Sequence, residues 1–166
     1  RQILENNKKI SLSQQMLNWE NQKALERNSN NKETGALEGV ALALPALMRA
    51  QKLQNRAARV GFDWKNIEPV FEKVSEELNE VKGALTNPKN LDHIAEEIGD
   101  LLFSCVNLAR HIKVDAEQAL KTGNEKFERR FTGVEIALHA EGKLFEECSL
   151  EELEKYWETV KSEEKT

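Results

Sequence analysis

The stretch Val70-Phe-Glu-Lys-Val-Ser-Glu-Glu-Leu-Asn-Glu-Val-Lys-Gly-Ala-Leu85 combines an apolar stripe with a dense acidic cluster. Its apolar residues return every three or four positions, at 70, 71, 74, 78, 81 and 85, which predicts an amphipathic helix. Glu77 and Glu80 are three residues apart, so their side chains share one face of that helix, about 5–6 Å apart at Cβ. Like charges at this spacing repel each other and weaken the helix unless a cation lies between them.

The next predicted helix repeats this arrangement. It follows Asn87-Pro88, starts near Asn90 and contains Glu96-Glu97-Ile98-Gly99-Asp100. Carboxylate oxygens from two helices suit a hard cation, and Mg²⁺ that keeps several of its waters is the natural occupant. Such a site usually has phosphate as its other ligand. The sequence therefore predicts a Mg²⁺ site formed by four carboxylates, Glu77, Glu80, Glu97 and Asp100.

Two small residues of this second helix carry expectations of their own. Gly99 costs about 1 kcal/mol relative to Ala inside a helix, so we expect it to allow the close approach of a neighbouring helix or of the metal ligands. Cys105 lies in the apolar run Leu101-Leu-Phe-Ser-Cys-Val106, so we expect it to be buried.

The remaining patterns predict further helices and no sheet. Pro in a first turn, Gly just after a last turn and capping boxes mark helix ends. They indicate helices from Leu44-Pro45 to about Val60, from Asp115 to about Glu141, and from Ser149 toward the end of the chain. The alternation of period two that is typical of strands is nowhere convincing, so the fold class is all-α.

Composition excludes several classes of function. The net charge of −5 and the lack of a basic stripe argue against a nucleic-acid polymer as partner. The longest apolar run, Val40–Met48, is far shorter than the ~20 residues that a membrane span needs. Cys105 and Cys148 are too few for a disulfide framework or a zinc site. We expect a cytoplasmic protein with no membrane partner.

An internal match suggests two related domains. Residues 11–27 and 149–165 align without gaps, and the match includes two of the three tryptophans, Trp19 and Trp157. The alternative is a pair of unrelated amphipathic helices that share Ser caps and charge. We favour the repeat and expect residues 1–27 to be the tail helix of a preceding, mostly missing domain. A polar linker would cover 28–36, and the catalytic domain would cover 37–166.

The acidic motifs and three further segments carry a family resemblance. Glu-Glu-x-x-Glu at 76–80 followed by Glu-x-x-Asp at 97–100 resembles the MazG-type nucleoside triphosphate pyrophosphohydrolases, and the likeness covers about residues 40–166. It includes Gly61-Phe-Asp-Trp64, Gly99-Asp-Leu-Leu-Phe103 and Asn124-Glu-Lys-Phe-Glu-Arg-Arg-Phe131. The resemblance implies the C-terminal domain of a two-domain bacterial protein, with a four-helix core completed by dimerisation. It also implies a homodimer or higher homo-oligomer with sites near the subunit contact.

The resemblance implies hydrolysis of NTPs or dNTPs to the monophosphate and pyrophosphate, in the control of nucleotide pools. A triphosphate carries about four negative charges, so acidic side chains would bind it through Mg²⁺, with Mn²⁺ as a substitute. Bound metal also activates water for in-line attack at the α-phosphate. Glu76 or Glu96 could orient or deprotonate that water, or either could be a solvated helix residue, which is the better default.

Basic residues downstream supply counter-charge for a triphosphate. Lys126, Arg129 and Arg130 lie within one turn of the fourth predicted helix, and Arg forks suit phosphate oxygens. Lys126 and Arg130 share a face, whereas Arg129 lies off it. On the last helix, Trp157 could stack on the base or anchor the core, and Lys161 could contact phosphate. Asn124 matches a family position that contacts phosphate or caps a kink.

Other candidates are better explained without a ligand. Lys52, Arg56 and Trp64 could line a nucleotide pocket, but a charged helix face and a packing aromatic are favoured. The histidines are interpreted as surface or helix-end residues, because they have no partner at metal-ligand spacing: His93, His111 and His139.

Two alternative functions remain open from the sequence. The acidic motifs alone fit a dUTPase-like or phosphoribosyl-ATP pyrophosphohydrolase equally well, and only the basic and Trp-containing helices favour the MazG type. A non-catalytic helical interaction module is the alternative from another class. Carboxylates that border apolar stripes argue against that module.

Overall fold

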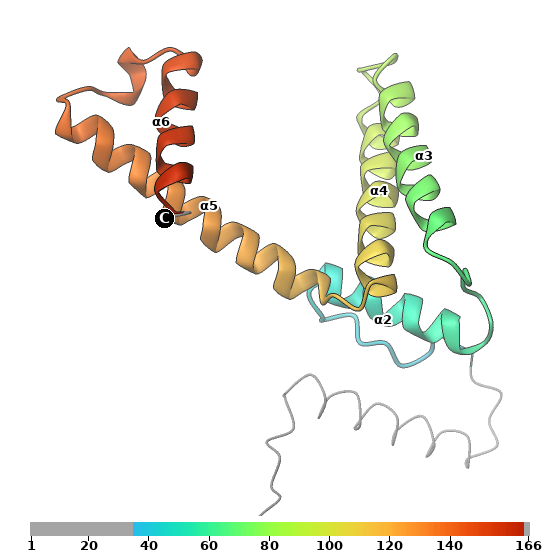
Figure 1. Ribbon diagram of the computed structural model, residues 1–166. Helices are drawn as coiled ribbons and strands as arrows, with labels where there is room; N and C mark the ends of the chain where they lie inside the picture. The colour runs from blue at the N-terminus through green and yellow to red at the C-terminus, as the bar shows by residue number, and fades with distance from the viewer. Residues whose placement is uncertain (1–34, 165–166) are drawn as a thin grey trace, which may run out of the picture. The chain divides into compact units, whose positions relative to one another are not determined.

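The computed structural model describes residues 35–164, which are helical and contain no strand. This confirms the predicted all-α class. The helices are α2 (Ala46–Arg59), α3 (Glu68–Ala84), α4 (Leu91–His111), α5 (Ala116–Ala140), a 3₁₀ turn η1 (Phe145–Glu147) and α6 (Leu150–Glu163). All belong to one compact unit that begins at Gly39 (Figure 1). The predicted tail helix at 1–27 and most of the predicted linker at 28–36 lie outside the described residues.

The predicted helix ends are built as capped turns. Gly61 after α2 and Gly142 after α5 have positive φ angles of 89° and 68°. In both turns the residue after the glycine donates a backbone hydrogen bond to a carbonyl of the last helical turn, Phe62 to Ala57 and Lys143 to Leu138. This pattern satisfies carbonyls that a helix end leaves free. Local sequence therefore set where these two helices end.

The helices pack in neighbouring pairs. α3 and α4 form the most extensive contact, α6 packs on α5, and α2 contacts both α4 and α5 (Figure 1). The buried apolar side chains come from α3, α4 and α5, with Val70, Val106 and Leu138 the most enclosed. The glycine that permits close helix packing is Gly133, where an added Cβ would lie 2.8 Å from Cγ1 of Val160 on α6. The expectation for Gly99 was wrong, because an added Cβ there meets nothing within 4 Å.

An aromatic cluster joins α5, η1 and α6. Phe127 lies 5.5 Å from Trp157 and 5.8 Å from Phe131, and Phe131 lies 5.2 Å from Phe145, all between ring centroids. Offset and tilted aromatic pairs at these separations add stability beyond the area they bury. Trp157 therefore anchors α6 on α5, as one of its two predicted roles requires.

The connection between α2 and α3 is tied to the end of α4. Asp63 accepts hydrogen bonds from Arg110 and from His111. The Arg110 hydrogen bond, followed by the charges of both partners, lowers the pKa of Asp63. His111 is the last residue of α4, as predicted, and this contact gives the Gly61–Trp64 segment a structural role.

Ser149→Ala is expected to lower the free energy of unfolding by about 1 kcal/mol. Ser149 Oγ accepts a hydrogen bond from the Glu152 amide at 3.3 Å, and the Ser149 amide donates one to Oε2 of Glu152 at 2.9 Å. Alanine removes the first of these bonds. Urea denaturation measures the change. Ser75→Ala, which alters an exposed hydroxyl within α3, is the matched control and should stay within about 0.5 kcal/mol. Equal stability of the two variants would contradict a stabilising cap.

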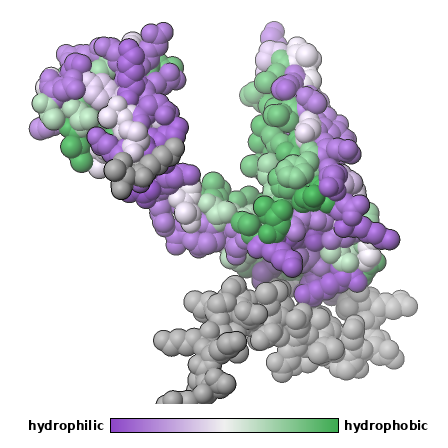
Figure 2. Space-filling model, viewed as in Figure 1, coloured by the Kyte–Doolittle hydropathy of each residue, from purple (hydrophilic) through white to green (hydrophobic). Residues whose placement is uncertain are grey.

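One apolar surface runs along α3 and α4. Figure 2 shows hydrophobic residues gathered over the length of these two helices. The large exposed side chains on them and on the C-cap residue of α3, Leu85, are here called the α3–α4 apolar face: Phe71, Leu78, Leu85, Leu91, Ile98, Leu102 and Phe103. Cys105 is also exposed, so the prediction that it is buried was wrong. An apolar run predicts burial only when another element covers its whole circumference, and no described residue covers this side of α4.

Candidate metal centre

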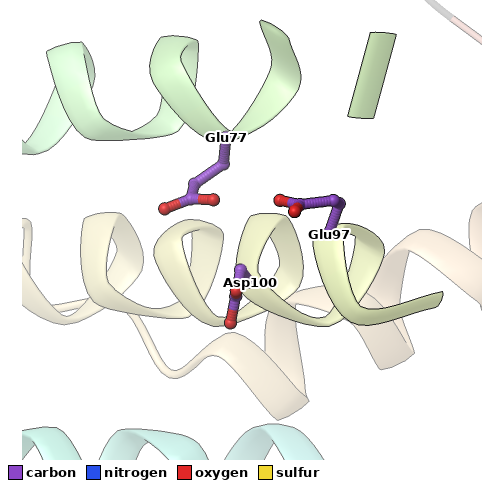
Figure 3. A group of neighbouring side chains, drawn as sticks. All are labelled: Glu77, Glu97 and Asp100. Atoms are coloured by element: carbon purple, nitrogen blue, oxygen red, sulfur yellow. The ribbon is translucent and has the colours of Figure 1, made fainter. Parts of the chain in front are cut away.

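The pairing of α3 with α4 brings three of the predicted carboxylates together. Glu77 projects from α3 toward α4, which carries Glu97 and Asp100 (Figure 3). One carboxylate oxygen from each residue lies within 4.8 Å of the others. The residues Glu97 and Asp100 are three apart on one helix, so their shared face follows from local geometry. The approach of Glu77 depends on how the two helices pack.

Burial is uneven across this cluster. Glu77 is only 4% exposed, Glu97 is half-buried and Asp100 is exposed. Oε2 of Glu77 is buried without a hydrogen-bond partner among the described residues. A buried carboxylate oxygen with no partner is costly, and a bound cation would satisfy it. The donor set, three carboxylates open to solvent on one side, fits a hard divalent ion.

Glu80 lies at the edge of the cluster. It is exposed and is not one of the three residues whose oxygens converge. The neighbouring Glu77 carboxylate raises the pKa of Glu80, and the charge of Glu97 acts in the same direction. Glu80 is therefore close enough to Glu77 and Glu97 for both carboxylates to raise its pKa. Its role as a fourth ligand stays a prediction.

Lys73 is a member of the site that sequence reasoning missed. Its Nζ lies 2.6 Å from Oε1 of Glu77 and 3.0 Å from Oε1 of Glu76. The hydrogen bond from Lys73 lowers the pKa of Glu77, and the two glutamates raise that of Lys73. The spacing of Lys73 and Glu77, four residues apart on one helix, could have revealed the pair. The positive charge of Lys73 thus offsets the repulsion between the buried Glu77 carboxylate and the other acidic groups of the cluster.

The two glutamates considered as candidates to orient water are not among the residues whose oxygens converge. Glu76 has a side chain that is 57% exposed and is held by Lys73. Glu96 has a side chain that is 74% exposed, with Oε2 3.9 Å from Nδ1 of His93. His93 also lies 3.4 Å from Oε1 of Glu97, so it borders the site rather than standing apart from it. No contact among the described residues favours a catalytic role over a solvated surface position for Glu76 or Glu96.

The predicted substrate-binding residues gather on α5 and α6 instead. Arg129 and Arg130 both donate to Glu164 at 2.7 Å, and Lys161 pairs with Glu158 at 2.9 Å. Lys126 and Asn124 are exposed, and Lys126 makes no ion pair within residues 35–164. The sequence favoured Arg130 over Arg129, but one carboxylate holds both.

Within residues 35–164, the carboxylates of α3 and α4 form no ion pair with the basic candidates of α5 and α6. Of the ion pairs found in residues 35–164, none joins Lys126, Arg129, Arg130 or Lys161 to the cluster on α3 and α4. Trp64 is 43% exposed in the connection after α2, and Lys52 and Arg56 each have an interaction partner of their own. Helix packing therefore assembles the carboxylates but leaves the phosphate-binding candidates as a second group.

No described helix has both the length and the apolar character to cross a membrane.

Comparison with known proteins places this cluster inside a recognised domain. Residues 65–134, which contain all four predicted metal ligands, match the MazG nucleotide pyrophosphohydrolase domain. The chain is 46% identical to the nucleoside triphosphate pyrophosphohydrolase of Escherichia coli (strain K12) over 156 residues. This alignment covers 92% of this chain and 58% of the E. coli protein. The chain is also 42% identical to the nucleoside triphosphate pyrophosphohydrolase/pyrophosphatase MazG of Thermotoga maritima over 148 residues. This alignment covers 89% of this chain and 56% of the T. maritima protein. The chain thus spans little more than half the length of these relatives. With the acidic motifs of α3 and α4 inside the matched domain, the chain belongs to the MazG family.

Proposed function

We propose that this chain hydrolyses nucleoside triphosphates or deoxynucleoside triphosphates to the monophosphate and pyrophosphate, in a reaction that depends on Mg²⁺. The observation that carries the proposal is the buried Oε2 of Glu77, which has no hydrogen-bond partner among residues 35–164 and lies in a cluster with Glu97 and Asp100. This cluster falls within the matched MazG domain. The names of the E. coli and T. maritima relatives give the same reaction class.

Glu77, Glu97 and Asp100 would hold the metal, with Glu80 beside them. When bound, Mg²⁺ neutralises phosphate charge and lowers the pKa of a coordinated water, and Mn²⁺ fits the same oxygen ligands. Glu77 is already fixed by burial and by Lys73, so its free oxygen needs little reorganisation to serve as a ligand. Lys73 would keep Glu77 ionised at neutral pH, because its hydrogen bond lowers the pKa of that carboxyl group.

The residues of α5 and α6 would bind the nucleotide. Lys126, Arg129, Arg130 and Lys161 supply positive charge for phosphate oxygens, and Asn124 adds a neutral amide. Trp157 has Phe127 near one side and the guanidinium of Arg130 at 6.0 Å from its ring centroid. A base would stack on whatever part of this half-buried ring remains accessible. The catalytic assignment of Glu76 and its alternative Glu96 stays a prediction.

A second copy of the chain would complete the site. The α3–α4 apolar face leaves large side chains in solvent, and such patches mark association surfaces. Burying this face against the same face of a second copy would form a four-helix core. It would also allow α5 and α6 of one chain to reach the carboxylates of the other. We therefore propose at least a homodimer.

Release of pyrophosphate from a panel of NTPs and dNTPs tests the proposed function. We expect release in the presence of Mg²⁺ or Mn²⁺ and none after chelation. Activity confined to dUTP or to phosphoribosyl-ATP would instead support one of the two related hydrolases. The absence of release from every nucleotide, with intact folding by circular dichroism, would favour the non-catalytic interaction module. The expected cytoplasmic location stays a prediction.

A further inference from the structure

We propose that Glu164 is a positioning residue, which holds Arg129 and Arg130 as a pair so that their terminal nitrogens together bind the polyphosphate of the substrate. This inference rests on the proposed function, which assigns the two arginines to the nucleotide. Glu164 follows the last residue of α6, whereas both arginines lie on α5.

The hydrogen bonds of Glu164 leave most of each guanidinium group available. Oε1 accepts from Nε of Arg129 and Oε2 accepts from Nε of Arg130, both at 2.7 Å. A guanidinium group has five N–H donors, and Nε supplies only one of them. Within the described part of the chain, neither arginine uses its Nη nitrogens in a hydrogen bond to another residue. The donors best suited to phosphate oxygens are therefore uncommitted.

The two arginines depend on Glu164 to different degrees. Arg130 has a side chain that is only 17% exposed, and its guanidinium also lies over the ring of Trp157. Arg129 has a side chain that is 62% exposed, and Glu164 is its one ion-pair partner in the described residues. Without Glu164, Arg129 would lose its anchor, and two adjacent positive groups would repel each other. Glu164 is thus the contact that aligns the exposed arginine with the more buried one.

The charge balance also favours anion binding. One carboxylate between two guanidinium groups leaves a net charge of about +1 on the three residues. The Glu164 side chain is 23% exposed, and both arginines lower its pKa, so it stays ionised at neutral pH. A triphosphate that bound the outer nitrogens would meet an ordered pair of donors rather than two independent side chains, which reduces the entropy cost of binding.

Steady-state kinetics with Mg²⁺ and ATP test this role. Glu164→Ala should raise KM about tenfold, the equivalent of one charge-assisted hydrogen bond, and leave kcat within about twofold. Glu164→Asp should recover part of the loss because it keeps the charge. Glu163→Ala is the matched control, since the neighbouring carboxylate is exposed and makes no ion pair with the described residues. A KM for Glu164→Ala that is unchanged, or lower than that of the wild type, would overturn the proposal.

A double-mutant cycle separates positioning from general support of the fold. In an Arg129→Ala/Arg130→Ala background, Glu164→Ala should cause no further rise in KM, because the groups that it positions are gone. A further rise of similar size would show that Glu164 acts in another way. Thermal unfolding of each variant checks that α6 stays packed on α5.

Binding of inorganic tripolyphosphate, measured by calorimetry, distinguishes this proposal from the proposed function. The wild type should bind tripolyphosphate about tenfold more tightly than Glu164→Ala does, whether or not any nucleotide is hydrolysed. Binding without hydrolysis would contradict the proposed function and leave the role of Glu164 supported. Equal affinities, or no binding by the wild type, would overturn the role of Glu164.

Discussion

Glu77→Gln is expected to lower kcat/KM for nucleoside triphosphate hydrolysis about 10²–10³-fold. Glutamine keeps the size of the side chain but removes its charge, and Glu77 is the most buried of the three clustered carboxylates. A metal ligand contributes several kcal/mol to stabilising the charge of the transition state, and each 1.36 kcal/mol is a factor of ten in rate. The fold should persist, because Lys73 keeps its ion pair with Glu76 at the helix surface.

Two measurements show whether the loss arises at the metal site. Mg²⁺ binding by calorimetry should weaken in Glu77→Gln together with activity, and excess Mg²⁺ should restore part of the rate. Glu135→Gln, which removes an exposed carboxylate of α5, is the control and should retain wild-type binding and activity. Wild-type kcat/KM in Glu77→Gln would contradict the assignment of this cluster as the catalytic metal site.

Mixing two inactive variants is expected to restore about a quarter of the wild-type activity. Glu97→Gln removes a carboxylate from α4, and Lys126→Ala/Arg130→Ala removes positive charge from α5. If each site takes its carboxylates from one chain and its basic residues from the other, every mixed dimer has one intact site. Random pairing gives half mixed dimers, each with half of its sites intact, hence about a quarter.

Co-expression with two different affinity tags isolates the mixed dimer for this measurement. The isolated mixed dimer should have about half of the wild-type activity. The control pair is Glu97→Gln with Glu77→Gln, which should recover nothing because both changes damage the carboxylate half of a site. Recovery equal to that control would show that each site lies within one chain. A monomer by light scattering would contradict the shared site and the homodimer together.

The sequence predicted the helices and the candidate ligands because both depend on local spacing. Pro45, Gly61, Gly142 and Ser149 mark helix ends through backbone geometry that a few neighbouring residues define. The pairs Glu77–Glu80 and Glu97–Asp100 share helix faces for the same reason. The sequence analysis did not predict the ion pair of Lys73 with Glu77, although the two residues are four apart, because the family motif contains only the acidic residues.

The errors concern residues whose environment depends on a distant element. Cys105 and Gly99 were both expected to lie against other groups, yet Cys105 is exposed and an added Cβ at Gly99 meets nothing within 4 Å. Gly133, which the sequence did not distinguish from other glycines, is where α6 approaches α5. The contact partners of a helix face are set by packing between segments that are far apart in sequence.

The sequence by itself determined that the chain is helical, where α2 and α5 end, where α6 begins, and which acidic residues share a helix face. These properties follow from the backbone and from spacings of three or four residues. Only the tertiary structure decided that Glu77 joins Glu97 and Asp100, and that Glu164 holds both arginines. Each of those contacts depends on burial, on side-chain orientation or on the pairing of α3 with α4 and α5 with α6. Burial of apolar faces is what selects these pairings, and it involves the whole chain rather than any one segment.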